Sequence, residues 1–360
     1  MTRRAYIDWL RGLAVVVMFM AHATDAWSVD EGRDSVAFMW RTIISGFAAP
    51  LFLLLAGTAV AYAAGSRVAR GAPDARVARD VAARGWQIFG IAFLFRLWMY
   101  VAGGFYRWQS LLKVDVLNIM GPAIAGAAYV WGLAQTSRGK MAVLLVPTVG
   151  LPFATPYIRG FSGFAPLPDP IEAYIRPAGG YAAFTLFPWA AFVFVGALVG
   201  VILRDARDRT DEARRVALVT LAGVLLAAGA WTASFYPSPF PNSSFWSTSP
   251  AFFFLRSGIM LALFGVAWIW SERLWAGQWQ PFVLLGQTSL FVYWVHVEVV
   301  YGYLTKPLYH RMPLWLSFAA LVPLTIAMYY LARHARAWLA HKRTEGITDW
   351  RTRALTIMGL

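Results

Sequence analysis

The chain has no cysteine and little charge, and each shortage excludes a class of chemistry. Without cysteine, its 360 residues can form no disulfide, no thiolate nucleophile and no thiolate-bound zinc site. Only 14% of the residues are charged and 59% are hydrophobic, whereas soluble domains have about 25% charged residues. This composition excludes an ordinary soluble protein of this length and indicates that the bilayer is the solvent.

The hydrophobic residues fall into runs of about 20, the length at which a helix crosses about 30 Å of hydrocarbon. Gly, Pro and clusters of charge separate the runs. We predict an all-α integral membrane protein, a polytopic bundle of about ten transmembrane helices. A single membrane domain would cover 1–335 and a basic tail 336–360. The predicted spans are 9–27, 42–64, 85–103, 116–135, 141–157, 181–203, 216–235, 251–271, 282–303 and 313–332.

The formal charge of +14 indicates membrane topology rather than nucleic-acid binding. No polar domain with a nucleic-acid-binding motif carries the 32 Lys and Arg residues. Positive loops stay on the cytoplasmic side, and most of these residues lie there if the amino terminus does. We therefore predict that both termini are cytoplasmic and that the basic loops and tail contact membrane lipids.

Ionisable side chains inside the first predicted span mark a candidate site, since each costs about 2.5–3.5 kcal/mol to insert. Arg11 and His22 share one helix face, about three turns apart. Arg11 is near the cytoplasmic end, where it could bind a phosphate. His22 is in the outer half, where a neutral imidazole could act as a base or nucleophile. Asp25, one turn further out, could orient that imidazole.

Further polar residues are predicted at compatible depths in other spans: Arg96, Asp115, Asn118, Arg256, His296 and Glu298. Arg96 is near mid-membrane, where it could meet a pyrophosphate, a thioester oxygen or a carboxylate. Taken singly, each is equally explained as an interhelical hydrogen-bond partner, or for Arg256 as a snorkelling side chain. No metal site is expected, because only His22 and His296 are placed to ligate one.

An uncharged loop, 236–250, lies on the predicted outer side and has the sequence YPSPFPNSSFWSTSP. Aromatic faces beside hydroxyl groups suit a sugar, which makes Trp246 a candidate substrate contact. An aromatic belt at the membrane interface explains the same composition and is more common.

Five segments together resemble the membrane-bound heparan-α-glucosaminide N-acetyltransferase family and its bacterial relatives. They lie in order between residues 7 and 296 and read IDWLRGLAVVVMFMAHATDAW, GFAAPLFLLLAG, DVLNIMGPA, FPWAAFVFVGALVG and LLGQTSLFVYWVH. The spacing from Arg11 to His22 is also similar to that in transmembrane sugar acyltransferases, where the His is taken as catalytic. Many of those enzymes carry paired arginines in the third span, and this chain has only Arg96 there.

The resemblance implies a transmembrane acetyltransferase of the bacterial cytoplasmic membrane. It would move an acetyl group from cytosolic acetyl-CoA to an amino or hydroxyl group of a sugar on the other side. His22 would be the base or a transient acyl carrier, two routes that stay open. The remaining assignments are Asp25, Asp115 and Asn118 as further catalytic residues, Arg11, Arg96 and Arg256 as acyl-CoA contacts, and His296, Glu298 and Trp246 as acceptor contacts.

A proton-coupled transporter or flippase is the main alternative. Its proton relay would use His22, Asp25, His296 and Glu298, and its arginines would steer an anionic or sugar-linked substrate. A non-enzymatic sensor or assembly subunit is a third option. An enzyme predicts CoA-dependent chemistry that is lost on changing His22, whereas a carrier predicts gradient-driven uptake without an acyl donor. The oligomeric state stays open, with a homodimer as one option.

Overall fold

The structure is a computed structural model that describes residues 4–30, 34–102, 108–240, 243–276, 278–346, 349–358 and 360. Within these residues the regular structure is helical, apart from two isolated bridges, Ser28–Met312 and Val114–Ala182. The predicted all-α class is therefore confirmed. The chain divides into two compact units, one of Phe52–Val266 and one that combines Thr2–Leu51 with Ala267–Leu360.

Seven helical stretches of the described residues are long and apolar enough to cross a membrane: Ala5–Trp27, Val36–Val68, Ser137–Gly160, Leu186–Arg204, Arg209–Ala233, Pro250–Leu274 and Leu314–Thr344. An eighth candidate is a pair of helices that meets at 91°. The other two predicted spans, 85–103 and 116–135, coincide with helices that miss this criterion, and residue 103 lies outside the described part. The chain is thus a polytopic α-helical membrane protein, and a total of ten spans stays a prediction.

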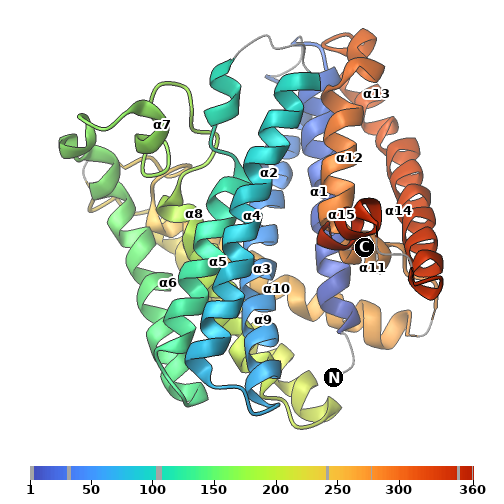
Figure 1. The fold of residues 1–360 in the computed structure, drawn as a ribbon. Helices are drawn as coiled ribbons and strands as arrows, with labels where there is room; N and C mark the ends of the chain where they lie inside the picture. The colour runs from blue at the N-terminus through green and yellow to red at the C-terminus, as the bar shows by residue number, and fades with distance from the viewer. Residues whose placement is uncertain are drawn as a thin grey trace. The chain divides into compact units, whose positions relative to one another are not determined.

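In its described residues, the unit of Phe52–Val266 is built mainly from seven helices: α3 (Ala48–Val68), α4 (Asp74–Ala102), α5 (Val116–Gly132), α6 (Ser137–Gly160), α8 (Leu186–Arg204), α9 (Arg209–Ala233) and α10 (Pro250–Ile269). Short elements join them: η1 (Trp108–Leu112), η2 (Ser162–Phe164) and α7 (Asp169–Glu172). Within this unit α4 packs along α5, and α8 packs against both α5 and α6 (Figure 1).

Close approach of helix backbones holds this unit together at Gly196 of α8. The Thr58 hydroxyl donates a hydrogen bond to the Gly196 carbonyl over 3.2 Å, and a Cβ added at Gly196 would meet the Leu54 carbonyl of α3. In a membrane, where lipid tails are as apolar as the side chains, such contacts between small residues drive helix association. The glycine is therefore required for packing rather than for a turn.

We expect Gly196→Ala to destabilise the protein by about 1–3 kcal/mol, because the new methyl group forces α3 and α8 apart. The measurement is the melting temperature of the purified protein in detergent. Gly90→Ala is the matched control, since Gly90 is also inside a helix but its added Cβ would meet nothing within 4 Å. Equal melting temperatures for the two variants would contradict this account of the contact.

The second unit is built on α1 (Ala5–Trp27) and a set of mostly carboxy-terminal elements: α2 (Val36–Ser45), η3 (Trp270–Leu274), α11 (Pro281–Gln287), α12 (Ser289–Tyr301), η4 (Tyr303–Leu308), α13 (Leu314–Ala319), α14 (Leu321–Thr344) and α15 (Trp350–Ile357). In this unit α1, α12 and α14 contact one another pairwise (Figure 1). The 91° bend lies between α11 and α12. The predicted boundary between membrane domain and tail, at residues 335 and 336, lies inside α14.

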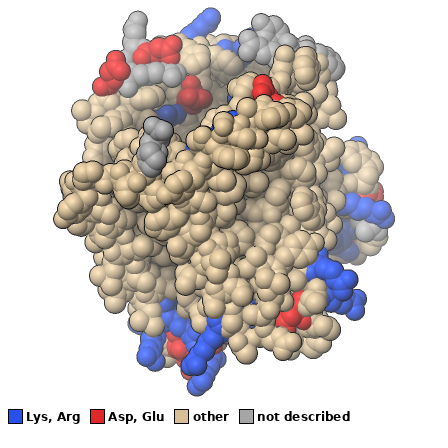
Figure 2. Space-filling model, turned by 90° about the vertical axis from the view of Figure 1, so that its left-hand side faces the viewer, with Lys and Arg blue, Asp and Glu red and all other residues tan. Residues whose placement is uncertain are grey.

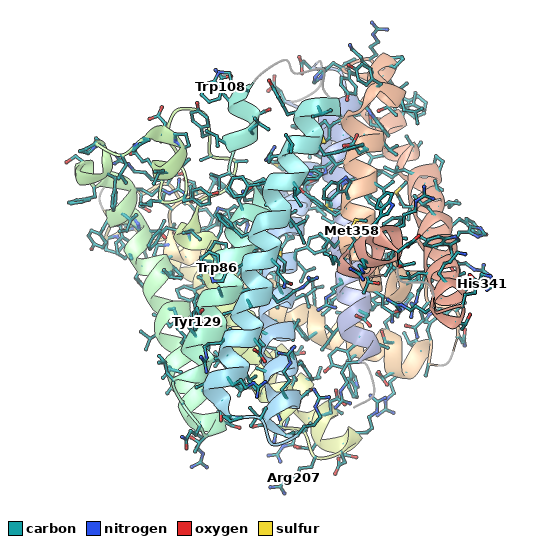
Figure 3. All side chains as sticks on the ribbon, in the orientation of Figure 1. Trp86, Trp108, Tyr129, Arg207, His341 and Met358 are labelled. Carbon is teal, nitrogen blue, oxygen red and sulfur yellow. The ribbon has the colours of Figure 1, made fainter. Side chains whose placement is uncertain are left out.

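Apolar side chains cover much of the exposed surface, as expected for helices in contact with lipid. Figure 2 shows a broad face on which Lys, Arg, Asp and Glu lie toward the edges and the middle is uncharged. Trp86 of α4 and Tyr129 of α5, labelled in Figure 3, are 49% and 48% exposed. Soluble monomers rarely expose large contiguous apolar surface, so this distribution fits a bilayer environment.

Candidate functional site

Two histidines far apart in the sequence, His22 of α1 and His296 of α12, lie next to each other. The distance from His22 Nδ1 to His296 Nε2 is 2.9 Å, and the ring planes differ by only 7°. The other nitrogen of His296, Nδ1, lies 3.0 Å from the carbonyl oxygen of Val292, one turn earlier in α12. His296 has no exposed surface, whereas His22 is half-buried. The structure thus links the predicted catalytic histidine to a buried histidine and a backbone carbonyl.

Asp25 and Tyr301 border the same imidazole. The hydroxyl of Tyr301, at the end of α12, donates a hydrogen bond to Asp25 Oδ2 over 3.2 Å. The Tyr301 ring meets the His22 ring edge-on, with 5.6 Å between the centroids. Asp25 is exposed, so its carboxylate can meet solvent as well as Tyr301.

Arg41 of α2 fixes a positive charge on the outer end of α1. Its Nε donates to the Thr24 hydroxyl over 2.5 Å, and its Nη2 donates to the Ala21 carbonyl over 2.6 Å. Only 9% of Arg41 is exposed. This guanidinium therefore adds charge-assisted hydrogen bonds to the residue before His22 and to the residue two after it along α1.

Sequence reasoning missed Arg41, Thr24 and Tyr301. Arg41 stands one residue before a predicted span, and no pattern ties it to α1. Tyr301 lies within the predicted span 282–303, but a Tyr near the end of a span is usually an interfacial anchor. Its position five residues after His296 was the only feature of the sequence that could have linked it to the site.

Arg11 lies near the start of α1, away from the histidine pair. Its Nη1 is 3.4 Å from Asp8 Oδ1, and Asp8 Oδ2 accepts a hydrogen bond from Gln287 over 3.1 Å. Arg336 of α14 donates to the same Gln287 side chain, which ends α11 at the bend. Glu298, two residues after His296 in α12, is half-buried. All of these residues belong to the second unit.

Three other predicted residues, Arg96, Asp115 and Asn118, contact one another in the first unit. Arg96 Nη2 lies 2.8 Å from Asp115 Oδ2. Asp115 also caps α5, because its Oδ1 accepts hydrogen bonds from the Leu117 and Asn118 amides, while Asn118 Oδ1 accepts from the Asp115 amide. This reciprocal pair is a capping box, which satisfies amides that the helix leaves open. The arrangement therefore has a structural task of its own.

Tyr174, in the loop after α7, lies beside this capping box. Asn118 Nδ2 donates to the Tyr174 hydroxyl over 3.4 Å. Burial raises the pKa of Tyr174 above its ordinary value, so its hydroxyl stays protonated at neutral pH. Together these residues anchor the loop to the start of α5, where Val114 also pairs with Ala182.

The last two predicted residues, Arg256 and Trp246, make aromatic contacts in the first unit. The Arg256 guanidinium lies 4.1 Å from the centre of the Phe252 ring and 6.0 Å from that of Trp189. Such contacts stabilise a cation that is removed from water. Trp246 is 63% exposed and packs edge-on against the Phe252 ring with 5.2 Å between centroids.

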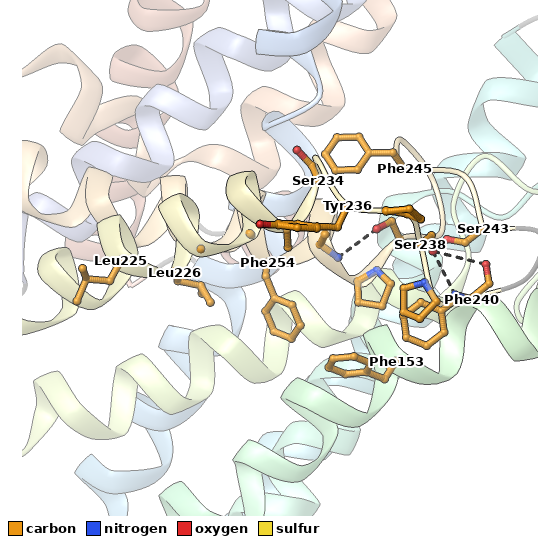
Figure 4. Close-up of a pocket in the computed structure, with 18 residues that line it drawn as sticks. Phe153, Leu225, Leu226, Ser234, Tyr236, Ser238, Phe240, Ser243, Phe245 and Phe254 are labelled. Atoms are coloured by element: carbon orange, nitrogen blue, oxygen red, sulfur yellow. Dashed lines mark hydrogen bonds between the residues drawn. The ribbon is translucent and has the colours of Figure 1, made fainter.

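A pocket of about 580 Å³ lies between α6, α9, α10 and the loop that follows α9 (Figure 4). Among the described residues, its lining contains no charged side chain. The lining combines aromatic rings, hydroxyl groups and aliphatic side chains (Figure 4). The rings are those of Phe153, Tyr236, Phe240, Phe245 and Phe254, the hydroxyl groups include those of Ser234, Ser238, Ser243 and Ser249, and Leu225 and Leu226 of α9 are aliphatic. The predicted contact Trp246 does not line it. The pocket suits a neutral ligand with both apolar faces and hydroxyl groups.

Comparison with known proteins gives one family match. The sequence model described as Heparan-alpha-glucosaminide N-acetyltransferase, catalytic, matches residues 3–241, which is more than half of the 360-residue chain. His22, Asp25 and Arg41 lie inside the matched segment, while His296 and Tyr301 lie beyond it. A search of curated proteins found no match to the chain.

Proposed function

The chain belongs to the heparan-α-glucosaminide N-acetyltransferase family, and on this basis we propose that it is a transmembrane acetyltransferase. It moves an acetyl group from cytosolic acetyl-CoA to an amino or hydroxyl group of a sugar on the extracytoplasmic side. The observation that carries this proposal is the hydrogen bond of 2.9 Å between His22 and His296 of α12. His22 is half-buried and lies inside the segment that the family model matches. A half-buried imidazole held by one nitrogen keeps the other available for proton transfer or acylation.

The polar residues around His22 support this chemistry. His22 acts as the base that deprotonates the acceptor or as a transient acyl carrier. Asp25 and Tyr301 supply a negative charge and a hydroxyl group beside it, and Arg41 supplies a fixed positive charge. A preorganised cation stabilises the oxyanion that forms when the thioester carbonyl is attacked.

Arg11, Arg96 and Arg256 remain our candidates for contacts with acyl-CoA. Arg11 is favoured because about a quarter of its side chain is exposed. Arg96 is already engaged by Asp115 at 2.8 Å, and Arg256 lies over aromatic rings. We therefore propose that Arg96 and Arg256 stabilise the fold in addition to contacting acyl-CoA.

We further propose ten membrane spans, cytoplasmic termini and a place in the cytoplasmic membrane of a bacterium. The distribution of Lys and Arg over the loops supports the orientation. Arg207, for example, lies in the short connection between α8 and α9, on the predicted cytoplasmic side (Figure 3). In this orientation acetyl-CoA reaches the protein from the cytoplasmic side of the membrane.

The uncharged pocket supports a sugar acceptor, because its rings and hydroxyl groups match the faces and hydroxyl groups of a pyranose. We expect Tyr236→Ala to raise KM for the acceptor about 10-fold, with KM for acetyl-CoA unchanged, because Tyr236 lines the pocket and its ring offers an apolar face to the sugar. Phe235→Ala is the matched control: Phe235 is 71% exposed and Tyr236 is 70% exposed, but only Tyr236 lines the pocket. Equal effects of both changes would exclude the pocket as the acceptor site.

The proposal is tested by incubating the full-length protein in detergent with acetyl-CoA and a panel of amino sugars and neutral sugars. We expect CoA release that depends on an acceptor, with the acetylated sugar identified by mass spectrometry. Treatment of the product with mild hydroxylamine distinguishes the two linkages, because it cleaves an ester and leaves an amide intact. Absence of both acetyl-CoA binding and CoA release across the panel would overturn the proposal.

A proton-coupled transporter or flippase is the second candidate, because two adjacent hydrogen-bonded pairs, His22–His296 and Tyr301–Asp25, contain groups that can exchange protons. Uptake into proteoliposomes under a proton gradient, without any acyl donor, would favour it. The family match favours the enzyme.

A further inference from the structure

We propose that His296 is a positioning residue that fixes the ring tautomer of His22 and leaves Nε2 as its reactive nitrogen. This inference rests on the proposed acetyl transfer for its consequence, but the hydrogen-bond pattern carries it independently. The pattern consists of two contacts in series, from His22 Nδ1 to His296 Nε2 at 2.9 Å and from His296 Nδ1 to the Val292 carbonyl at 3.0 Å.

The position of each proton follows from the Val292 carbonyl, at which this series of hydrogen bonds ends. A carbonyl oxygen only accepts hydrogen bonds, so the nitrogen that faces Val292, His296 Nδ1, carries a proton. A neutral imidazole has one N–H, so His296 Nε2 has a lone pair and accepts. His22 Nδ1 must then donate to it, and the single proton of a neutral His22 is used there. His22 Nε2 is left with its lone pair.

The other contacts of His22 agree with this assignment. Across the described residues, no protein group forms a hydrogen bond with His22 Nε2, and His22 is half-buried rather than enclosed. Asp25, the predicted orienting group, accepts its hydrogen bond from Tyr301 instead. The role often filled by a carboxylate in a catalytic dyad therefore falls to a fully buried imidazole.

A fixed Nε2 lone pair has a defined use in acetyl transfer. The acceptor nitrogen or oxygen forms a bond to the thioester carbonyl carbon, and its proton passes to His22 Nε2. The C–S bond then breaks, and the CoA thiolate leaves with the electron pair and takes that proton to become the thiol. While His22 holds the extra proton, its Nδ1–H points at the His296 lone pair, which stabilises the imidazolium.

The tautomer is tested directly by nitrogen NMR of the full chain in detergent, with histidine labelled by the heavy nitrogen isotope in the ring. The His22 signals are identified by their loss in His22→Ala. We expect an unprotonated Nε2 and a protonated Nδ1 in the wild type, and a mixture of tautomers in His296→Leu. A protonated Nε2 in the wild type would overturn the proposal, whether or not the protein transfers acetyl groups.

Kinetics separate positioning from a merely structural role. Removing the acceptor in His296→Leu is expected to lower kcat about 10²-fold with both KM values unchanged, because the His22 ring loses its defined orientation. His296→Gln, whose amide oxygen can accept from His22 Nδ1, is expected to recover part of that loss. Equal kcat for the Leu and Gln variants, at equal melting temperature, would contradict the assignment. The expected tautomer in a protein that neither binds acetyl-CoA nor releases CoA would refute the acetyltransferase and leave the hydrogen-bond assignment standing.

Discussion

His22→Ala is expected to lower acceptor-dependent CoA release by about 10²–10⁴-fold, the range that a positioned acid–base group contributes. The imidazole is the only group in this part of α1 that can both take a proton and form an acyl intermediate at neutral pH. Its ring is half-buried, and the residue before it and the residue two after it are held by Arg41, so truncation should leave the helix in place. The measurement is kcat from the initial rate of CoA release.

The matched control is His341→Ala, which removes an imidazole that is exposed in α14 (Figure 3). Its rate and melting temperature should equal those of the wild type. His22→Gln adds a second test, because glutamine keeps a hydrogen bond to His296 but supplies neither a base nor a nucleophile. Substantial activity in His22→Gln would show that the imidazole acts only in packing, and would remove His22 from the chemistry.

The two routes left open by the sequence also separate here. If His22 carries the acetyl group, incubation with acetyl-CoA alone releases about one CoA per protein and leaves a labelled imidazole. If His22 is only a base, no CoA is released until an acceptor is added. The free Nε2 serves either route, so the distinction is kinetic.

The sequence predicted the helices well because hydrophobic runs are local. All ten predicted ranges overlap helices of the described residues, as one piece or as adjoining pieces, and 282–303 differs most in shape. There the chain bends by 91° at Thr288. No proline marks this break in LLGQTSLFVYW, so hydropathy alone shows a continuous span.

The candidate site was predictable only to the level of depth in the membrane. Depth placed His22 and His296 in the same half, and the structure gives them a direct contact across 274 residues of sequence. Depth did not distinguish this contact from others, because residues at the same depth touch only if their helices are neighbours, and hydropathy does not show which helices are neighbours. Arg41 was beyond reach for the same reason, since its bonds to α1 depend on how α2 folds back.

Asp115 illustrates a local signal that sequence reasoning left unused. Asp115 and Asn118 stand three residues apart immediately before an apolar run, which resembles the pattern of a capping box. Their depth instead suggested catalytic roles, and those roles stay predictions. The structure adds a second duty through the 2.8 Å ion pair with Arg96, so stability and catalysis must be separated by experiment.

Asp115→Ala is expected to destabilise the protein by about 3–5 kcal/mol, since it leaves the largely buried Arg96 without its carboxylate and removes the cap of α5. Asp115→Asn keeps a good capping side chain and should lose less. The measurement is the melting temperature in detergent, and an unchanged value for Asp115→Ala would contradict this account.

The double change Asp115→Asn with Arg96→Met then decides between the two duties. It removes both charges while keeping the cap and a side chain of similar length, and replacement of a whole buried ion pair is often close to neutral. If Asp115 acts only through structure, the double variant should regain both melting temperature and the kcat measured at saturating acetyl-CoA, where a higher KM from the loss of Arg96 has no effect. If its carboxylate takes part in the reaction, melting temperature should recover while kcat stays low. The second outcome would place the ion pair in the reaction itself, and the first would reduce the site to the histidine pair and its neighbours in the other unit.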